Sequence, residues 1–238
     1  MDDDGAPRPV IWMRDPSPRR GPRPTHTRQE IAQVAMSIAD EQGLDAVSIR
    51  AVAKELGAGA ASLYRYIDSK ADLYDLMVDA ATAEFSLPNA PSGDQRADLT
   101  TIGNRARAVY QRHPWAITLS SNASWGPHVQ AYMEFFLAVL KPTGLNARQQ
   151  LELIAHFNAS VATFAAHERQ QTDQPGNPEA LQARMMHLKQ IAENPELPHL
   201  STAVATMLNS TPEDTDPDKL FRRSLDRLID TIPAQTDG

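Results

Sequence analysis

The chain has 238 residues, a formal net charge of −7 and no cysteine, which excludes disulfides, thiolate nucleophiles and cysteine redox switches. No apolar run approaches the roughly 20 residues that a membrane-spanning helix needs, and the acidic residues 2–4 are not followed by the apolar core of a secretory signal. We therefore expect a cytoplasmic protein without a membrane partner, and the lack of alternating strand patterns favours an all-α fold.

Residues 1–24 are rich in proline and arginine and are expected to form a disordered basic arm. Between residues 8 and 28 the acidic residue is Asp15 alone, and the arginines are Arg8, Arg14, Arg19, Arg20, Arg23 and Arg28. Such arginines can reach phosphates or an adjacent minor groove, and a solvated tail without a fixed role is an equally good interpretation. The apolar run VIWM at 10–13 is unusual in an arm and could dock on the folded body.

Charge is distributed unevenly along the chain. Residues 1–70 hold ten Lys or Arg and ten Asp or Glu, a net charge of zero, whereas the rest holds thirteen and twenty, a net charge of −7. This asymmetry suits a DNA-binding end joined to an acidic body that does not adhere to DNA.

The first proper helix is predicted to start after Thr25 or Thr27, where Glu30 can complete a capping box with Thr27. Apolar residues recur at helical spacing from Ile31 onward, and Gly43 is expected to end the helix. Its apolar face can brace the two short helices that follow.

The stretch from 48 to 70, SIRAVAKELGAGAASLYRYIDSK, predicts two short helices joined by a glycine-centred corner. Ser48 is a good N-cap for the first helix, and Gly57 is well suited to end it. The second helix is expected to run from about Gly59 to Ile67, with Leu63 and Ile67 facing inward. Two helices with so brief a corner form a helix-turn-helix, whose second member can enter the DNA major groove.

A dense set of positions in and after this stretch carries a family signature: Ser48, Val52, Ala53, Leu56, Gly57, Ser62, Leu63, Tyr64, Tyr66, Ile67, Ser69, Lys70 and Leu73. Together they closely resemble the tetracycline-repressor (TetR) family of transcriptional regulators. The family usually has a polar residue or threonine near Gly59 and a phenylalanine at Ile67, so the chain departs from the pattern there. The resemblance implies an N-terminal three-helix helix-turn-helix DNA-binding domain and a helical C-terminal ligand-binding and dimerisation domain.

The candidate DNA-binding residues are Ser48, Arg50, Ala60, Ala61, Ser62, Tyr64, Arg65, Tyr66 and Lys70. Tyrosine hydroxyls and Lys70, at the amino end of a helix, suit phosphate oxygens. By the resemblance, Arg50 falls on a position that can contact a base, and Arg65 is a second candidate for the bidentate guanine contact of arginine. The two alanines offer methyl groups for thymine contacts or for close approach. The alternative for the tyrosines and Lys70 is an ordinary solvated surface.

Ser69 is expected to cap a helix that ends at about Phe85 and joins the DNA-reading head to the rest. Prolines and a glycine at 88–93 then mark a break, which gives a first domain at 25–87 and a second at 95–232. The second domain is predicted to contain a loop or short helix at 115–125 and helices at about 95–112, 127–140, 147–171, 179–193, 198–209 and 217–231.

The long helix from 147 and the last helix each carry an apolar stripe. The resemblance extends, less specifically, to residues 133–170 and to the tail FRRSLDRLIDTI, and it implies that these helices supply a two-fold dimer interface. The stripes fit an internal core equally well. A homodimer is favoured because two tethered half-sites multiply the affinity of one reading helix.

The candidate ligand-binding residues are Trp115, Trp125, His128, Tyr132, His156, Phe157, Asn158 and Phe164. Small-molecule pockets combine apolar walls with a few polar groups, as this set does, although aromatic residues at helical spacing are more often core. The histidines lack metal-ligand spacing, and there is no phosphate-binding loop, nucleophile elbow or HExxH motif. We therefore expect no metal, no cofactor, no catalytic residue and no enzyme.

These patterns predict a ligand-responsive transcriptional regulator that binds double-stranded operator DNA as a homodimer. The simplest form is a repressor that an unidentified small molecule releases from its operator. An activator or dual regulator of the same fold is an alternative. A second alternative, from another class, is an all-helical small-molecule-binding protein or enzyme whose helix-turn-helix is vestigial.

Overall fold

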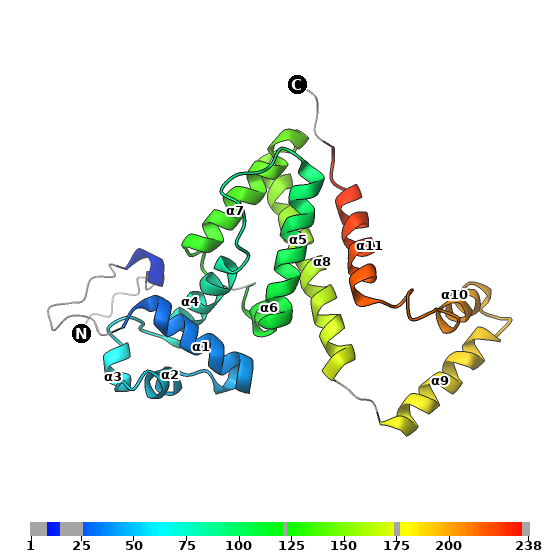
Figure 1. Ribbon diagram of the computed structural model, residues 1–238, viewed down its shortest axis with the longest axis horizontal. Coiled ribbons are helices and arrows are strands. Elements are labelled where there is room, and N and C mark those ends of the chain that lie inside the picture. Colours follow the sequence, from blue (N-terminus) through cyan, green and yellow to red (C-terminus); the bar gives the residue numbers. More distant parts are fainter. Residues whose placement is uncertain (1–8, 15–25, 121–122, 174–176, 235–238) are drawn as a thin grey trace, which may run out of the picture. The chain divides into compact units, whose positions relative to one another are not determined.

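The structure is a computed structural model in which residues 9–14, 26–120, 123–173 and 177–234 are described. Every regular element within these ranges is a helix (Figure 1). The predicted all-α fold is therefore confirmed. Within the same ranges, no helix combines the length and the apolarity that crossing a bilayer requires.

The amino-terminal head contains three α-helices and a 3-10 turn: α1 (Arg28–Gln42), η2 (Leu44–Ala46), α2 (Ile49–Glu55) and α3 (Ala60–Leu63). The predicted capping box forms at the start of α1, where the Thr27 hydroxyl accepts a hydrogen bond from the Glu30 amide and the Glu30 carboxylate accepts one from the Thr27 amide. Gly43 ends the helix, also as predicted. All three helices bury apolar side chains in one core, whose fully buried members are Ile31, Ala35, Val47, Val52, Leu63 and Ile67.

The second helix of the motif is shorter than the predicted 59–67. It ends at Leu63, and the chain continues as a turn. The amides of Arg65 and Tyr66 donate to carbonyls three residues earlier, at 3.3 and 2.9 Å, which is the bonding of a tighter 3-10 turn. Gly59, which precedes the helix, offers its first amides no side-chain cap. A helix with a weak start and a tightened end is therefore limited to about one turn.

Helix α4 (Lys70–Ala83) connects the head to the body. Ser69 caps it as predicted, and Asp72 completes a second capping box by accepting hydrogen bonds from the Ser69 amide and, at 2.6 Å, from the Asp68 amide. The helix packs against α1 on the head side and against α7 on the body side. Leu73 and Met77 are fully buried along its length.

The body continues through five further elements: α5 (Gln95–Arg112), α6 (Trp115–Leu119), α7 (Pro127–Leu140), the 3-10 turn η3 (Lys141–Thr143) and α8 (Ala147–Asp173). The helices predicted at 95–112 and 127–140 have these bounds in the structure, and the one predicted at 147–171 extends to Asp173. Edge-to-face aromatic pairs hold the interior together, with centroid separations of 5.2 Å between Phe85 and Tyr132, 5.9 Å between Tyr132 and Phe136, and 5.1 Å between Phe136 and Phe157.

The chain divides into two compact units, and the division differs from the predicted domains. The first unit comprises residues 1–166 and 232–238, and the second comprises residues 167–231. The break predicted at 88–93 does not separate units, because α4 packs on both the head and the body. The second unit contains the end of α8 and three more helices: α9 (Pro178–Ala192), α10 (Pro198–Leu208) and α11 (Pro217–Asp230).

Residues 10–14 fold against the body, in contrast to the disordered arm predicted for residues 1–24. They form a short 3-10 helix, η1 (Ile11–Met13), and the Ile11 side chain is fully buried. The apolar run at 10–13 thus docks, because burying its isoleucine and tryptophan offsets the entropy of ordering a few residues. The remaining predicted arm, including Arg8, Arg19, Arg20 and Arg23, lies outside the described residues.

Candidate nucleic-acid interface and effector cavity

The first turn of α2 presents an arginine to solvent. Ser48 precedes the helix and accepts a hydrogen bond from the Ala51 amide at 3.1 Å, so its side chain acts as the predicted cap. Arg50 lies in the first turn and is exposed, whereas its neighbour Ile49 is buried in the core. This arrangement leaves the Arg50 guanidinium accessible to a partner.

The chain around α3 separates into a buried and an exposed side. Leu63 and Ile67 are fully buried, as predicted, while Tyr64 is 54% exposed and Arg65 is exposed. Tyr66 is half-buried, and its hydroxyl accepts a hydrogen bond from the His26 amide at 3.3 Å. The segment therefore has its own core contacts and still exposes Tyr64 to solvent.

The remaining predicted DNA-binding residues lie at the starts of α3 and α4. Ala61 is exposed and Ala60 is half-buried in the first turn of α3, and the Ser62 hydroxyl donates to the Gly59 carbonyl at 2.6 Å. Lys70 is the first residue of α4 and is exposed, with its Nζ 5.2 Å from the centre of the Tyr74 ring. Its ammonium group lies where a helix amino terminus also favours anions.

Arg14, in the predicted basic arm, and Arg28, the first residue of α1, both belong to the arginine-rich stretch at 8–28. The Arg14 guanidinium forms ion pairs with Asp68, at 2.5 Å, and with the buried Asp72. Burial lowers the pKa of the Arg28 guanidinium, and the nearby positive charge of Arg14 lowers it further. In this structure the Arg14 guanidinium is thus ion-paired within the protein.

Helices α4 to α8 enclose a cavity of about 760 Å³ within the first unit. Its walls are largely aliphatic and aromatic, as in most small-molecule sites, and its volume falls in the usual range for them. Among the described residues that line it, none carries a charge. The lining residues with polar side-chain groups are Thr82, Tyr110, Ser120, Trp125, Tyr132, Asn158 and Thr163.

The structure brings three of the eight predicted ligand-binding residues to this cavity: Trp125, Tyr132 and Asn158. The Tyr132 hydroxyl donates a hydrogen bond of 2.5 Å to the Asn158 side-chain oxygen. Burial raises the pKa of the Tyr132 phenol, and it also raises that of the Tyr110 phenol. Both phenols are therefore neutral hydrogen-bonding groups at physiological pH.

The other five predicted residues lie away from the lining. The Trp115 indole is buried and donates to the Asp40 carboxylate at 2.7 Å, and His128 places Nδ1 2.8 Å from Asp79 Oδ2. Phe157 is fully buried in the aromatic core, while His156 is exposed and Phe164 is half-buried. Aromatic residues at helical spacing look the same in a sequence whether they wall a cavity or fill a core, which explains the error.

Sequence reasoning missed most of the cavity wall. Phe85 and Tyr110 line it, although both had been placed within helices without a ligand role, and α4 contributes Val78, Ala81 and Thr82. The α8 stripe lies along the cavity: Ile154, Val161 and Ala165 are buried, and Leu151, Ala155, Asn158 and Ala162 line the cavity, although Leu151 remains 42% exposed. A wide apolar stripe with a single asparagine was the available signal for that wall.

A polar junction joins α1 of the head to α5 and α6 of the body. The buried His113 has Nδ1 2.8 Å from Asp40 Oδ1 and Nε2 3.2 Å from Glu84 Oε2. Asp40 belongs to α1 and also accepts the Trp115 indole proton. No group of three or more His, Cys, Asp or Glu that could hold a metal ion occurs among the described residues.

Two family models match the chain in tandem. The model described as "Bacterial regulatory proteins, tetR family" matches residues 31–77, and the one described as "Tetracyclin repressor-like, C-terminal domain" matches residues 87–236. The first match coincides with the helix-turn-helix head, and the second alone covers more than half of the chain.

Two characterised sequences are similar over a large part of the chain. The HTH-type transcriptional repressor DrrR1 of Streptomyces coeruleorubidus is 34% identical over 166 residues, which cover 69% of this chain and 62% of DrrR1. An HTH-type transcriptional regulator of Saccharopolyspora erythraea is 34% identical over 142 residues, 59% of each protein. The chain thus spans less than two thirds of the length of either relative.

A solved structure has the same fold. The TetR family protein ActR of Streptomyces coelicolor, in complex with actinorhodin, matches with a TM-score of 0.71 over 87% of this chain and 95% of that chain. The sequence identity is 23%, so this likeness concerns the fold alone.

Proposed function

This chain belongs to the TetR family of bacterial regulatory proteins, and from that premise we propose that it is a DNA-binding transcriptional repressor which a small molecule releases from its operator. The observation that carries the proposal is the position of α4. The helix begins at the end of the reading head, with Lys70, and about two to three turns later its side chains wall the cavity, with Val78 and Thr82. One rigid element therefore contacts both places where the proposed partners bind.

The proposed DNA contacts divide into two kinds. The exposed Arg50 is assigned to a bidentate contact with guanine, which an arginine guanidinium can make, and Arg65 is a second candidate. Lys70 and the hydroxyl of the exposed Tyr64 are assigned to phosphate oxygens, which position the protein without specifying a sequence. Ser48 and Ser62 keep their backbone hydrogen bonds and support the two reading elements.

The effector is proposed to be an uncharged, mainly apolar molecule. Burying a charged group beside these walls would be costly, because no lining side chain among the described residues carries a compensating charge. The Asn158 amide nitrogen has no hydrogen-bond partner among the described residues, and its oxygen is occupied by Tyr132. The amide therefore suits a carbonyl or hydroxyl oxygen of the effector.

The proposed mechanism is a shift of population between two conformers. An effector in the cavity favours a position of α4 in which the two heads of a homodimer no longer match successive major grooves. The homodimer is part of this proposal, since one reading head has little affinity by itself. The printed name of DrrR1, a repressor, supports the sign of the regulation.

The DNA-binding part is tested by fluorescence anisotropy with labelled DNA from the promoter of the protein's own gene. The affinity should fall steeply as salt is raised, and a specific component should survive an excess of unrelated competitor DNA. Affinity that is equal for promoter and competitor at every salt concentration would refute operator binding.

The proposal of an uncharged effector is tested with two dyes, one uncharged and one cationic. We expect the uncharged dye Nile red to bind with an emission increase, and the cationic dye rhodamine 6G not to bind. Asn158→Leu removes the amide but keeps the approximate size of the side chain, and it should weaken Nile red binding several-fold, by roughly one hydrogen bond. Preferential binding of rhodamine 6G would overturn the assignment of an uncharged effector. Promoter binding that becomes tighter with dye would reverse the proposed sign of regulation.

A further inference from the structure

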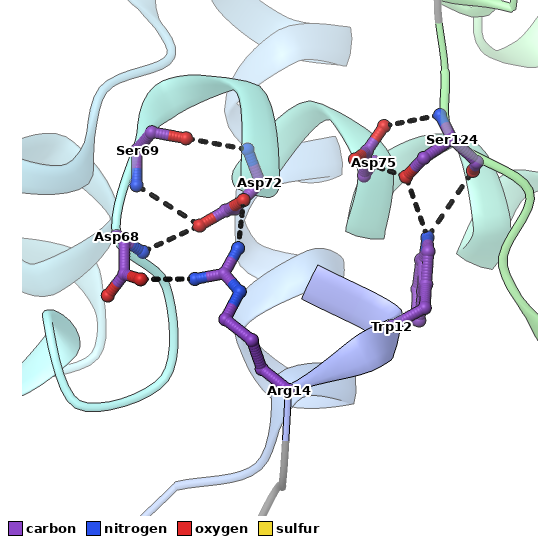
Figure 2. A network of polar contacts seen from close by, with 7 residues as sticks. All are labelled: Trp12, Arg14, Asp68, Ser69, Asp72, Asp75 and Ser124. Carbon is purple, nitrogen blue, oxygen red and sulfur yellow. Dashed lines mark hydrogen bonds and ion pairs between the residues drawn. The ribbon is translucent and has the colours of Figure 1, made fainter. Parts of the chain in front are cut away.

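The short segment at 10–14 links two places that the proposed function requires to communicate (Figure 2). At one end, the Trp12 indole donates to the Ser124 hydroxyl at 2.9 Å and to the Ser124 carbonyl at 3.3 Å. At the other end, two residues later, Arg14 pairs with Asp68 and Asp72 at the start of α4. We name residues 10–14 the N-terminal clip.

The Trp12 end of the clip holds the rim of the cavity. Ser124 lies between Ala123 and Trp125, both of which line the cavity. Its amide donates to the Asp75 carboxylate of α4 at 2.8 Å, and its hydroxyl also contacts Asp75. Figure 2 shows Trp12 and Asp75 meeting at Ser124 from different elements. A displacement of the rim therefore moves the atoms to which Trp12 is bonded.

The Arg14 end holds the junction between the reading segment and α4. Asp72 is buried and accepts hydrogen bonds from the Asp68 and Ser69 amides, so it fixes the path of the chain from Ile67 into α4. Asp68 and Asp72 carry like charges close together, and Arg14 compensates both (Figure 2). Removing Arg14 would leave a buried carboxylate with less compensation at the base of the proposed DNA-binding surface.

The clip is short and well anchored, so it can transmit displacement between its ends. Ile11 is fully buried, and residues 11–13 form a 3-10 helix whose end is held by the Arg14 amide, which donates to the Ile11 carbonyl at 3.3 Å. The Trp12 ring also packs closely against Gly126, since a Cβ added to this glycine would lie 2.5 Å from the Trp12 Cζ2 atom. We therefore expect the clip to move as one body when either its Trp12 end or its Arg14 end is displaced.

We propose that the N-terminal clip couples the cavity rim to the reading head, with Trp12 and Arg14 as positioning residues for regulation by the effector. This inference rests on the proposed function for its biological meaning. The mechanical link itself can be tested without DNA or effector.

Hydrogen–deuterium exchange of the whole protein tests the link through effects at the distant end. Arg14→Gln should increase exchange of the Ser124, His128 and Val129 amides, which Asp75 and Asp79 hold. Trp12→Phe keeps the aromatic packing but loses the indole donor, and it should increase exchange of the Asp68 and Asp72 amides. Arg148→Gln, at an exposed ion pair on α8, is the control for the charge change and should alter neither region. Changes confined to the end that was substituted would overturn the link.

Measurements of promoter affinity distinguish a clip that couples the cavity rim to the reading head from one that only stabilises the fold. Trp12→Phe and Arg14→Gln should each weaken binding about fivefold, and together hardly more than either alone, because both act through one element. Two outcomes would overturn the coupling: additive losses of affinity in the double variant, or unchanged promoter affinity in both single variants despite altered exchange. In either case the clip would only stabilise the fold. If the wild-type protein fails to bind the promoter specifically, the proposed function fails instead, and the exchange experiment still decides the link.

Discussion

Arg50 and Lys70 lie in the first turns of α2 and α4, and both side chains are exposed. Arg50→Ala should cost about 1–3 kcal/mol at the preferred operator and relax the sequence preference at one position, because a bidentate base contact is lost. Lys70→Ala should weaken binding to all sequences alike and reduce the salt slope by about 1, because a phosphate contact is lost. Competition binding with a set of operator variants at several salt concentrations measures both effects.

Lys54→Ala provides the control for this pair, since Lys54 is an exposed cation on α2 to which no DNA contact is assigned. It should change neither the sequence preference nor the affinity appreciably. The assignment of Arg50 to a base and of Lys70 to a phosphate is wrong if Arg50→Ala and Lys70→Ala lose sequence preference to the same extent.

The phenols of Tyr110 and Tyr132 give a prediction about pH. Burial raises the pKa of each above the ordinary value of 10, so the folded protein holds these protons when the unfolded chain has begun to lose them. The free energy of unfolding should therefore be unaffected by these two groups below pH 10 and fall as pH rises above 10. Urea unfolding at a series of alkaline pH values should show this fall, and Tyr110→Phe combined with Tyr132→Phe should make it shallower. An unchanged slope in the double variant would contradict the assigned burial.

At the residue scale, the sequence predicted the buried and exposed positions of the head better than the cavity. Leu63 and Ile67 were expected to face inward because they are apolar and lie one turn apart, and they are fully buried. Trp115 was placed in the cavity because it is aromatic, yet it is held by Asp40, a residue far away in the chain. Spacing along a helix indicates which side chains share a face, and it carries no information about what that face meets.

Helix ends were the most predictable feature at the element scale. Thr27, Ser48 and Ser69 each cap the helix that was expected to follow them, because a hydroxyl before an apolar-periodic run satisfies amides that would otherwise lack partners. Two elements were not predictable in this way. α3 is short because Gly59 provides no cap, and the clip at 10–14 depends on Ser124 and Asp72, which the sequence alone does not bring near it.

Gly126 gives a prediction for the element that begins with α7. A Cβ at this position would lie 2.3 Å from the Asp79 carboxylate oxygen and 2.5 Å from the Trp12 ring, so Gly126→Ala has to displace one of them. We expect a loss of about 1–3 kcal/mol in the free energy of unfolding, measured by urea denaturation. Gly59→Ala is the matched control, since its added Cβ meets nothing within 4 Å and its φ of −74° suits alanine. Equal stability of the two variants would show that the clip and α4 do not enclose Gly126 closely.

On the scale of the whole molecule, the head and most of the body form one unit because α4, His113 and the clip join them. The proline and glycine residues at 88–93 suggested a boundary, and they mark a turn between helices of the same unit. A domain boundary depends on long-range packing, which composition does not reveal. The second unit, residues 167–231, contains apolar side chains that are exposed in the single chain, among them Leu181, Met185, Met186, Leu200 and Met207.

Sequence-specific DNA binding by two paired heads is the central feature of the proposed function. Duplexes selected by the protein from a random-sequence pool, followed by nuclease footprinting of the enriched sequence, measure this directly. We predict two half-sites related by two-fold symmetry, with centres one helical turn apart, about 34–36 Å, or a multiple of it. Enrichment of no common sequence, or protection of a single half-site without a symmetric partner, would contradict the account.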